Sequence, residues 1–143
     1  DAFTQWITRN PEHYDVVVTS NMFGDIATDL ASILQGGMGM AGSGNIGDDH
    51  AFFEPVHGSS PKYAGMNKVN PIASINSVHM MIDWLGRKNS DQGLLDISKL
   101  IEDSVEQHLK EGKLLTYDLG GDASCSSVGD AIAANLEEKL SEL

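Results

Sequence analysis

The sequence predicts an α/β protein, in which helices flank a sheet. A run of three valines lies in an extended pattern at Tyr14–Ser20, and a second extended pattern covers Ala51–Val56. Continuous apolar runs are typical of strands that are covered on both faces, as in a mixed or parallel sheet. Apolar residues at helical spacing within 72–85 and 97–109 predict amphipathic helices that provide this cover.

Composition limits the partners and the compartment. The 143 residues can bury a core, and one compact domain is the default. A formal net charge of −12 disfavours a nucleic-acid partner, because phosphate backbones would be repelled. No apolar run is long enough to cross a bilayer, so no membrane partner is expected. The single cysteine fits a reducing compartment, the cytoplasm or alternatively the mitochondrial matrix.

Start and stop residues mark the helices. We expect five helices, over residues 1–9, 25–35, 71–85, 94–111 and from 127 to the C-terminus, and a short extended piece at 114–117. Asn70-Pro71 supplies a capping residue and a first-turn proline for the third helix. Gly86 and Gly112 are placed to end the third and fourth helices. Ser127 opens a pattern that resembles a capping box.

Residues 36–47 are rich in glycine, and Gly37–Gly42 matches the dinucleotide-binding pattern G-x-G-x-x-G. That pattern binds dinucleotides when a strand precedes it and a helix begins within it. Here a helix precedes it and a strand follows, so we reject the match. The six glycines are expected to let the backbone turn sharply and pack closely against another segment.

Two aspartates are spaced one helical turn apart. Asp25 stands at the expected start of the second helix and Asp29 follows four residues later, so both carboxylates project from one face. Two hard oxygen ligands suit Mg²⁺ or Mn²⁺, with substrate and water completing the coordination sphere. In the alternative interpretation, Asp25 only caps the helix and Asp29 is solvated.

Three runs of residues carry a resemblance to a known family: Ser20–Asp29 (SNMFGDIATD), Phe53–Gly65 (FEPVHGSSPKYAG) and Lys68–Ala73 (KVNPIA). Together they resemble the metal-dependent decarboxylating dehydrogenases of 2-hydroxy acids, the isocitrate/isopropylmalate dehydrogenase family, and isocitrate dehydrogenase most of all. The likeness extends over nearly the whole chain. It implies the C-terminal part of the isopropylmalate dehydrogenase-like fold, which is not a classical Rossmann fold.

The resemblance also implies how the chain is divided. Residues 1–35 would close the small domain, and residues 36–143 would form the C-terminal part of the large domain with an incomplete sheet. The family's chains are more than twice this length, and this sequence does not begin with Met. We therefore expect a C-terminal fragment of a protein that forms a homodimer.

The resemblance assigns site residues one by one. Asp25 and Asp29 match the metal-binding aspartates, with Asp25 in the catalytic role, and Asp1 matches a third metal ligand that reaches the neighbouring subunit. The metal would hold the hydroxyl and carboxylate of a hydroxy-acid substrate and stabilise the enolate formed on decarboxylation. The implied cofactor-binding residues are Glu54, His57, Gly58, Ser59, Ser60, Lys62, Tyr63, Ala64, Val69, Asn70, Tyr117 and Asp118.

Within this set, two neighbouring residues favour NADP over NAD. NAD-specific relatives tend to have Asp-Ile where this chain has Lys62-Tyr63, and a lysine and a tyrosine suit a 2′-phosphate. Tyr117 matches a further 2′-phosphate contact, although it also fits a residue that packs on the last helix. NADP-linked isocitrate enzymes carry an arginine near position 121, where this chain has Gly121, so NAD stays the alternative cofactor.

The implied activity is oxidation and decarboxylation of isocitrate to 2-oxoglutarate, as in the tricarboxylic acid cycle. The family's substrate-clamping arginines and its proton-transfer tyrosine and lysine have no match here, so the chain alone is expected to be inactive. Two alternatives stay open. The substrate is isopropylmalate or homoisocitrate, or the chain belongs to a non-catalytic subunit that binds nucleotide or assembles with a partner.

Overall fold

The computed structural model describes residues 1–141. In chain order its elements are α1 (Ala2–Arg9), α2 (Asn21–Ala31), β1 (Gly42–Ile46), β2 (Ala51–Pro55), α3 (Ile72–Asn89), α4 (Gln92–Glu111) and α5 (Cys125–Leu140). Short 3-10 turns follow α1 and α2 and lie within the connecting loops. None of the described helices has the length and apolar character that a membrane span requires. The expected continuation of the last helix to Leu143 lies outside the described residues.

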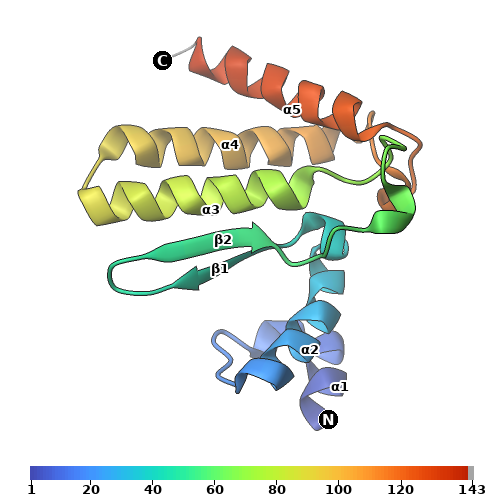
Figure 1. Cartoon of the computed structure of the whole chain (residues 1–143), viewed down its shortest axis with the longest axis vertical. Coiled ribbons are helices and arrows are strands. Elements are labelled where there is room, and N and C mark those ends of the chain that lie inside the picture. Colours follow the sequence, from blue (N-terminus) through green and yellow to red (C-terminus); the bar gives the residue numbers. More distant parts are fainter. Residues whose placement is uncertain (142–143) are drawn as a thin grey trace.

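The helices and the hairpin form a layered arrangement (Figure 1). α3 and α4 pack side by side, α5 packs on α4, and the hairpin β1–β2 lies against α3, while α1 and α2 pack on each other at the N-terminal end. The core gathers buried side chains from several segments: Met40, Ile72, Val105, Val128 and Ile132. Burial of these apolar groups holds the start of α3, the middle of α4 and the first half of α5 together.

The strand expected at Tyr14–Ser20 is not formed. The sheet within the described residues is a two-stranded antiparallel hairpin, in which Gly42 pairs with Pro55 and Ile46 with Ala51. Val16 and Val18 are 84% and 93% exposed, because no described strand lies beside them. A strand is stable only when its backbone groups bond to a neighbour, so the apolar pattern was insufficient. Residues 1–141 are thus helix-rich with one small sheet.

Three helices begin earlier than expected, and one of them is α4, which begins at Gln92 instead of residue 94. α2 begins at Asn21, so Asp25 lies in its second turn and does not cap it. α5 begins at Cys125, and its cap is Ser124, whose side chain accepts a hydrogen bond from the Ser127 backbone N–H at 3.1 Å. The capping box expected at Ser127 is therefore wrong. The segment 114–117 forms no strand and leads into a 3-10 turn, Tyr117–Leu119.

Gly86 does not end α3, which continues to Asn89 and stops at Ser90 in the left-handed conformation. Gly86 is buried where α3 meets α4. A Cβ at this position would lie 2.8 Å from Cδ2 of Leu95 and 3.1 Å from its backbone nitrogen. The glycine therefore serves close helix packing. The expected stop at Gly112 is confirmed, because Gly112 caps α4 with a φ of 61°.

Gly86→Ala is expected to lower the free energy of unfolding by about 1–2 kcal/mol, because overpacking against Leu95 outweighs the helix propensity of alanine. Urea unfolding measures the effect. Gly129→Ala in α5 is the matched control, because no atom lies within 4 Å of its Cβ position. That change is expected to raise the free energy of unfolding by roughly 0.5–1 kcal/mol. A gain in stability at both positions would contradict the packing role of Gly86.

Candidate cofactor cleft and metal-binding pair

A cleft of about 560 Å³ opens where the loop after β2 meets the turn before α5. These two loops lie side by side at the same end of the helical layers (Figure 1). The cleft walls come from four segments, which are the glycine-rich 36–39, the loop 57–70, the turn at 117–118 and the first residue of α5. Segments that are far apart in the sequence thus share one concave surface.

Ten of the twelve residues expected to bind cofactor line this cleft: His57, Gly58, Ser59, Ser60, Tyr63, Ala64, Val69, Asn70, Tyr117 and Asp118. The other two do not. Glu54 is exposed on β2. Lys62 is exposed, and its ammonium lies 5.5 Å from the centroid of the Tyr63 ring.

Asn70 and Asp118 form a fixed polar pair in the cleft wall. Asn70 is 6% exposed, and its amide donates to Oδ2 of Asp118 at 3.0 Å and accepts from the backbone N–H of Ile72 at 2.9 Å. The Thr116 hydroxyl donates to Oδ1 of Asp118 at 2.5 Å. A Cβ at Gly39 would lie 2.8 Å from Oδ2 of Asp118, so only glycine lets the backbone approach this pair. The close packing expected of the glycine-rich segment is confirmed.

Two tyrosines and Lys68 lie together at the cleft. The ring centroids of Tyr63 and Tyr117 are 5.4 Å apart, and Nζ of Lys68 is 4.8 Å from the centroid of Tyr117. Hydrogen bonding with Tyr63, with smaller contributions from partial burial and the charge of Asp118, raises the pKa of the Tyr117 phenol. The hydrogen bond favours the neutral phenol and ties the Tyr117 hydroxyl to that of Tyr63.

Asn67 joins the cleft loop to the start of α5. Its backbone carbonyl accepts from the N–H of Cys125 at 2.9 Å. Its side-chain oxygen accepts from the N–H of Ser126 at 3.0 Å, and its amide donates to the Ser126 hydroxyl at 2.8 Å. These bonds hold the loop beside the helix and so fix the shape of the cleft.

Several residues of the cleft were not expected from the sequence: the glycine-rich segment 36–39, Gly65, Asn67, Lys68 and Cys125. For the glycine-rich segment a signal was present, because its composition predicts close packing of the backbone. Asn67 lies between two matching runs, and Lys68 is the first residue of the third run, but the contacts of both are with residues that are far away in the sequence, Ser126 and Tyr117.

Asp25 and Asp29 lie on α2, and both are exposed. Their spacing on one helix fits two oxygen ligands of Mg²⁺ or Mn²⁺. Among residues 1–141, however, no three acidic, histidine or cysteine side chains come together. Asp1 instead caps α1, where its carboxylate accepts from the backbone N–H of Ala2 at 2.5 Å. The spacing of Asp25 and Asp29 is thus compatible with two metal ligands, and the described residues supply no third.

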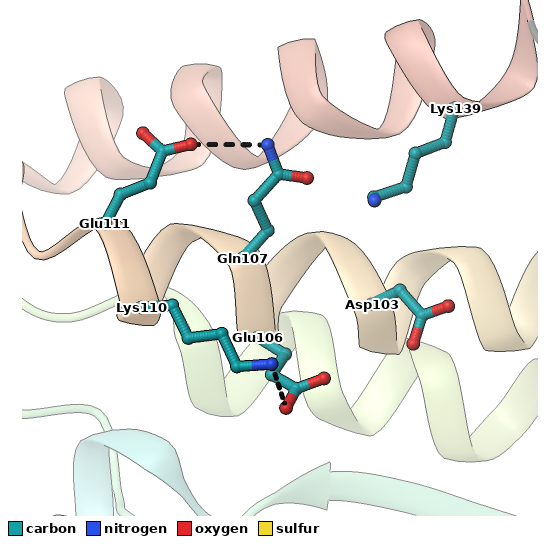
Figure 2. Close-up of a pocket in the computed structure, with 6 residues that line it drawn as sticks. All are labelled: Asp103, Glu106, Gln107, Lys110, Glu111 and Lys139. Carbon is teal, nitrogen blue, oxygen red and sulfur yellow. Dashed lines mark hydrogen bonds and ion pairs between the residues drawn. The ribbon is translucent and has the colours of Figure 1, made fainter.

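A second hollow lies on the surface of α4 and beside α5. Figure 2 shows its lining residues, which are Asp103, Glu106, Gln107, Lys110, Glu111 and Lys139. Lys110 pairs with Glu106 at 2.7 Å, and Gln107 donates to Glu111 at 3.2 Å. Exposed pairs one turn apart are typical of a solvated helix face and contribute little stability. This hollow is therefore a charged surface and not a site with converging groups.

Comparison with known proteins identifies relatives over nearly all of the chain. The family model described as isocitrate/isopropylmalate dehydrogenase matches residues 1–132. The chain is 46% identical over 140 residues to the homoisocitrate dehydrogenase of Methanocaldococcus jannaschii, a match that covers 98% of this chain and 38% of that protein. It is also 46% identical over 137 residues to the isocitrate/homoisocitrate dehydrogenase of Thermus thermophilus, with 96% of this chain and 39% of that protein covered.

Solved structures show the same relationship. The isocitrate dehydrogenase from Methylococcus capsulatus matches with a TM-score of 0.84 and 35% identity, over 94% of this chain and 38% of that chain. The chain therefore spans less than two-fifths of the length of these relatives.

Proposed function

Since the chain belongs to the isocitrate/isopropylmalate dehydrogenase family, we propose that the complete protein oxidises and decarboxylates a 2-hydroxy acid with a nicotinamide cofactor. The chain contributes the site for the adenosine half of the cofactor and two ligands of a divalent metal. In this proposal residues 1–35 close the small domain and residues 36–143 belong to the large domain. One observation carries the proposal. Ten of the twelve residues that match the family's cofactor contacts line a single cleft.

The chemistry of the cleft supports a nucleotide. Asn70, which matches the family's adenine contact, is held in one wall of the cleft by its hydrogen bonds with Asp118 and Ile72. Backbone N–H groups and hydroxyls at 58–60 supply donors for phosphates without a Rossmann helix. Tyr63 and Tyr117 add phenol hydroxyls, and Lys68 places a positive charge over their rings. NADP is the proposed cofactor, and NAD is the alternative.

The proposed metal ligands are Asp25 and Asp29, with Mg²⁺ or Mn²⁺ as the ion. When bound, the ion would supply Lewis-acid stabilisation of the negative charge that develops on the substrate oxygens. The two exposed carboxylates would hold it at the surface of α2, and Asp1 of a second subunit would complete the site in a homodimer. The substrate-clamping arginines and the proton-transfer groups would come from the remainder of the protein.

The substrate proposed first is isocitrate, because Lys62-Tyr63 and Tyr117 match the NADP-linked isocitrate enzymes. Homoisocitrate is the second candidate. It is favoured by the relatives from Methanocaldococcus jannaschii and Thermus thermophilus, whose names include this substrate. Isocitrate and homoisocitrate differ by one methylene group. In this proposal, that part of the substrate is contacted by the remainder of the protein and not by residues 1–143.

A substrate-by-cofactor assay of the full-length protein tests the proposal. Isocitrate, homoisocitrate and isopropylmalate are each offered with NADP⁺ and NAD⁺, with and without Mg²⁺. Metal-dependent reduction of NADP⁺ by isocitrate is the expected result, whereas the 143-residue chain alone is expected to show no turnover. The absence of turnover with every pair, together with intact nucleotide binding, would favour the non-catalytic alternative.

A further inference from the structure

The first turn of α5 depends on hydrogen-bond acceptors that lie outside the helix. The backbone N–H groups of its first three residues, Cys125, Ser126 and Ser127, have no carbonyl one turn earlier in the helix to which they can bond. The side chain of Ser124 accepts from the N–H of Ser127 at 3.1 Å. The other two N–H groups bond to Asn67, which is 59 positions away from Ser126 in the sequence. Asn67 is therefore a helix cap that a distant loop supplies.

The backbone and the side chain of Asn67 both bond to this turn. Its carbonyl accepts from the N–H of Cys125, its side-chain oxygen accepts from the N–H of Ser126, and its amide donates to the Ser126 hydroxyl. Asn67 has a φ of 50°, a left-handed conformation that asparagine adopts more readily than most residues. Its side chain is exposed, so truncating it removes two of these bonds and leaves no cavity.

Asn67 is also the backbone anchor of the loop that forms one wall of the cleft. Among the described residues, the bond from Cys125 to Asn67 is the one backbone–backbone hydrogen bond that joins the segment 57–69 to the rest of the chain. The other such bonds of this segment lie within residues 60–66. Gly65 and Lys68, which line the cleft, lie on either side of Asn67 in the sequence. The position of this wall therefore depends on the first turn of α5.

We propose that Asn67 is a positioning residue that couples the cleft to α5: capping the first turn of α5 orders the loop, and a ligand that orders the loop stabilises this turn in return. The inference rests on the proposed function, because the ligand is the adenosine half of the cofactor. Asn67 acts through the position of the loop and needs no contact with the cofactor. Ser126 lies outside the cleft lining, and it therefore contributes to cofactor affinity only through its bonds with Asn67.

The first test measures binding of NADPH and NADH to the full-length protein by the fluorescence of the dinucleotide. Asn67→Gly keeps the left-handed backbone and the carbonyl but removes both side-chain bonds. It is expected to weaken binding of the preferred dinucleotide about tenfold, the effect expected of two hydrogen bonds. Ser126→Ala removes one of these bonds and is expected to weaken binding about threefold. The double variant is expected to bind as weakly as Asn67→Gly alone, because both residues act through the same bonds.

Steady-state kinetics separate positioning of the cleft from a general loss of stability. In Asn67→Gly, KM for the dinucleotide is expected to rise, while kcat and KM for the hydroxy acid stay unchanged. Asp91→Ala is the matched control, because Asp91 caps α4 through a side-chain bond from the N–H of Leu94 at 3.1 Å but lies outside the cleft. That variant is expected to melt at a lower temperature and to keep the KM of the unmodified protein.

Hydrogen exchange tests the coupling in the opposite direction, from the cleft to the helix. A saturating concentration of the preferred dinucleotide is expected to slow exchange of the Ser126 N–H about tenfold in the unmodified protein. In Asn67→Gly the dinucleotide is expected to leave this exchange rate unchanged. Exchange of Ser126 that is equally fast with and without dinucleotide in the unmodified protein would overturn the coupling.

The binding results separate this inference from the proposed function. Unchanged dinucleotide affinity in Asn67→Gly would overturn the inference and leave the cofactor cleft standing. A loss in Asn67→Gly without any loss in Ser126→Ala would also overturn it, because Asn67 would then contact the cofactor itself. Failure of the unmodified protein to bind either dinucleotide would remove the proposed cofactor site and this inference with it.

Discussion

Gly121→Ala is expected to lower the free energy of unfolding by about 3 kcal/mol, at the upper end of the range for overpacking. The added methyl group would overlap the carbonyl oxygen of Leu115 and lie 2.9 Å from its Cβ. The obstacle is backbone, which cannot rotate away as a side chain can. Relief requires breaking the bonds that close the turn, from Gly121 to Thr116 and from Ala123 to Leu115. Thermal unfolding should shift downward by roughly 10 °C.

Gly58→Ala is the control for this prediction. Gly58 lies in the cleft loop with no atom within 4 Å of its Cβ position, and its change is expected to stay within about 0.5 kcal/mol. Similar melting temperatures for the two variants would show that the turn relaxes easily. The same geometry predicts that Gly121→Arg destabilises the protein and adds no affinity for a 2′-phosphate.

The sequence predicted those residues of the cleft that lie close to one another in the chain. The loop 57–65 and Asn70 lie in two nearly continuous runs, so the family resemblance of these runs was enough to place them in one site. The packing of Tyr63 on Tyr117 and the bonds of Asp118 depend on how the turn before α5 folds back on this loop. No local pattern encodes that approach, although the resemblance implied a cofactor contact for each of these residues.

The strand expected at Ala51–Val56 is confirmed by β2, Ala51–Pro55, whereas β1 was not predicted. β1 consists of Gly-Ser-Gly-Asn-Ile, a composition with low β-propensity, and its pairing with β2 comes from tertiary packing. Gly42 lies so close to α3 that a Cβ would be 3.1 Å from the Ser77 nitrogen, which explains why small residues form this strand. The valine-rich 14–20 segment has the opposite composition but lacks a described neighbour. Strand formation is decided by partners that are distant in sequence.

Asp25→Asn in the full-length protein is expected to reduce metal-dependent turnover by at least about 100-fold, because a lost ligand removes several kcal/mol of transition-state stabilisation. Asp25 is exposed on α2, and its side chain makes no ion pair with another described residue. Stability without metal should therefore change by less than about 0.5 kcal/mol. Steady-state kinetics over a range of Mg²⁺ concentrations measures turnover, and calorimetric titration with Mn²⁺ measures binding directly.

Asp130→Asn provides the matched comparison for this prediction. Asp130 is also an exposed helical aspartate, on α5, and its replacement removes the same unit of charge from the surface. A fall in turnover in both variants would indicate a general electrostatic effect on an acidic protein. A fall in Asp25→Asn alone, with weaker Mn²⁺ binding, would identify the second turn of α2 as the metal site. Unchanged turnover of Asp25→Asn at saturating Mg²⁺ would instead leave Asp25 and Asp29 as solvated charges.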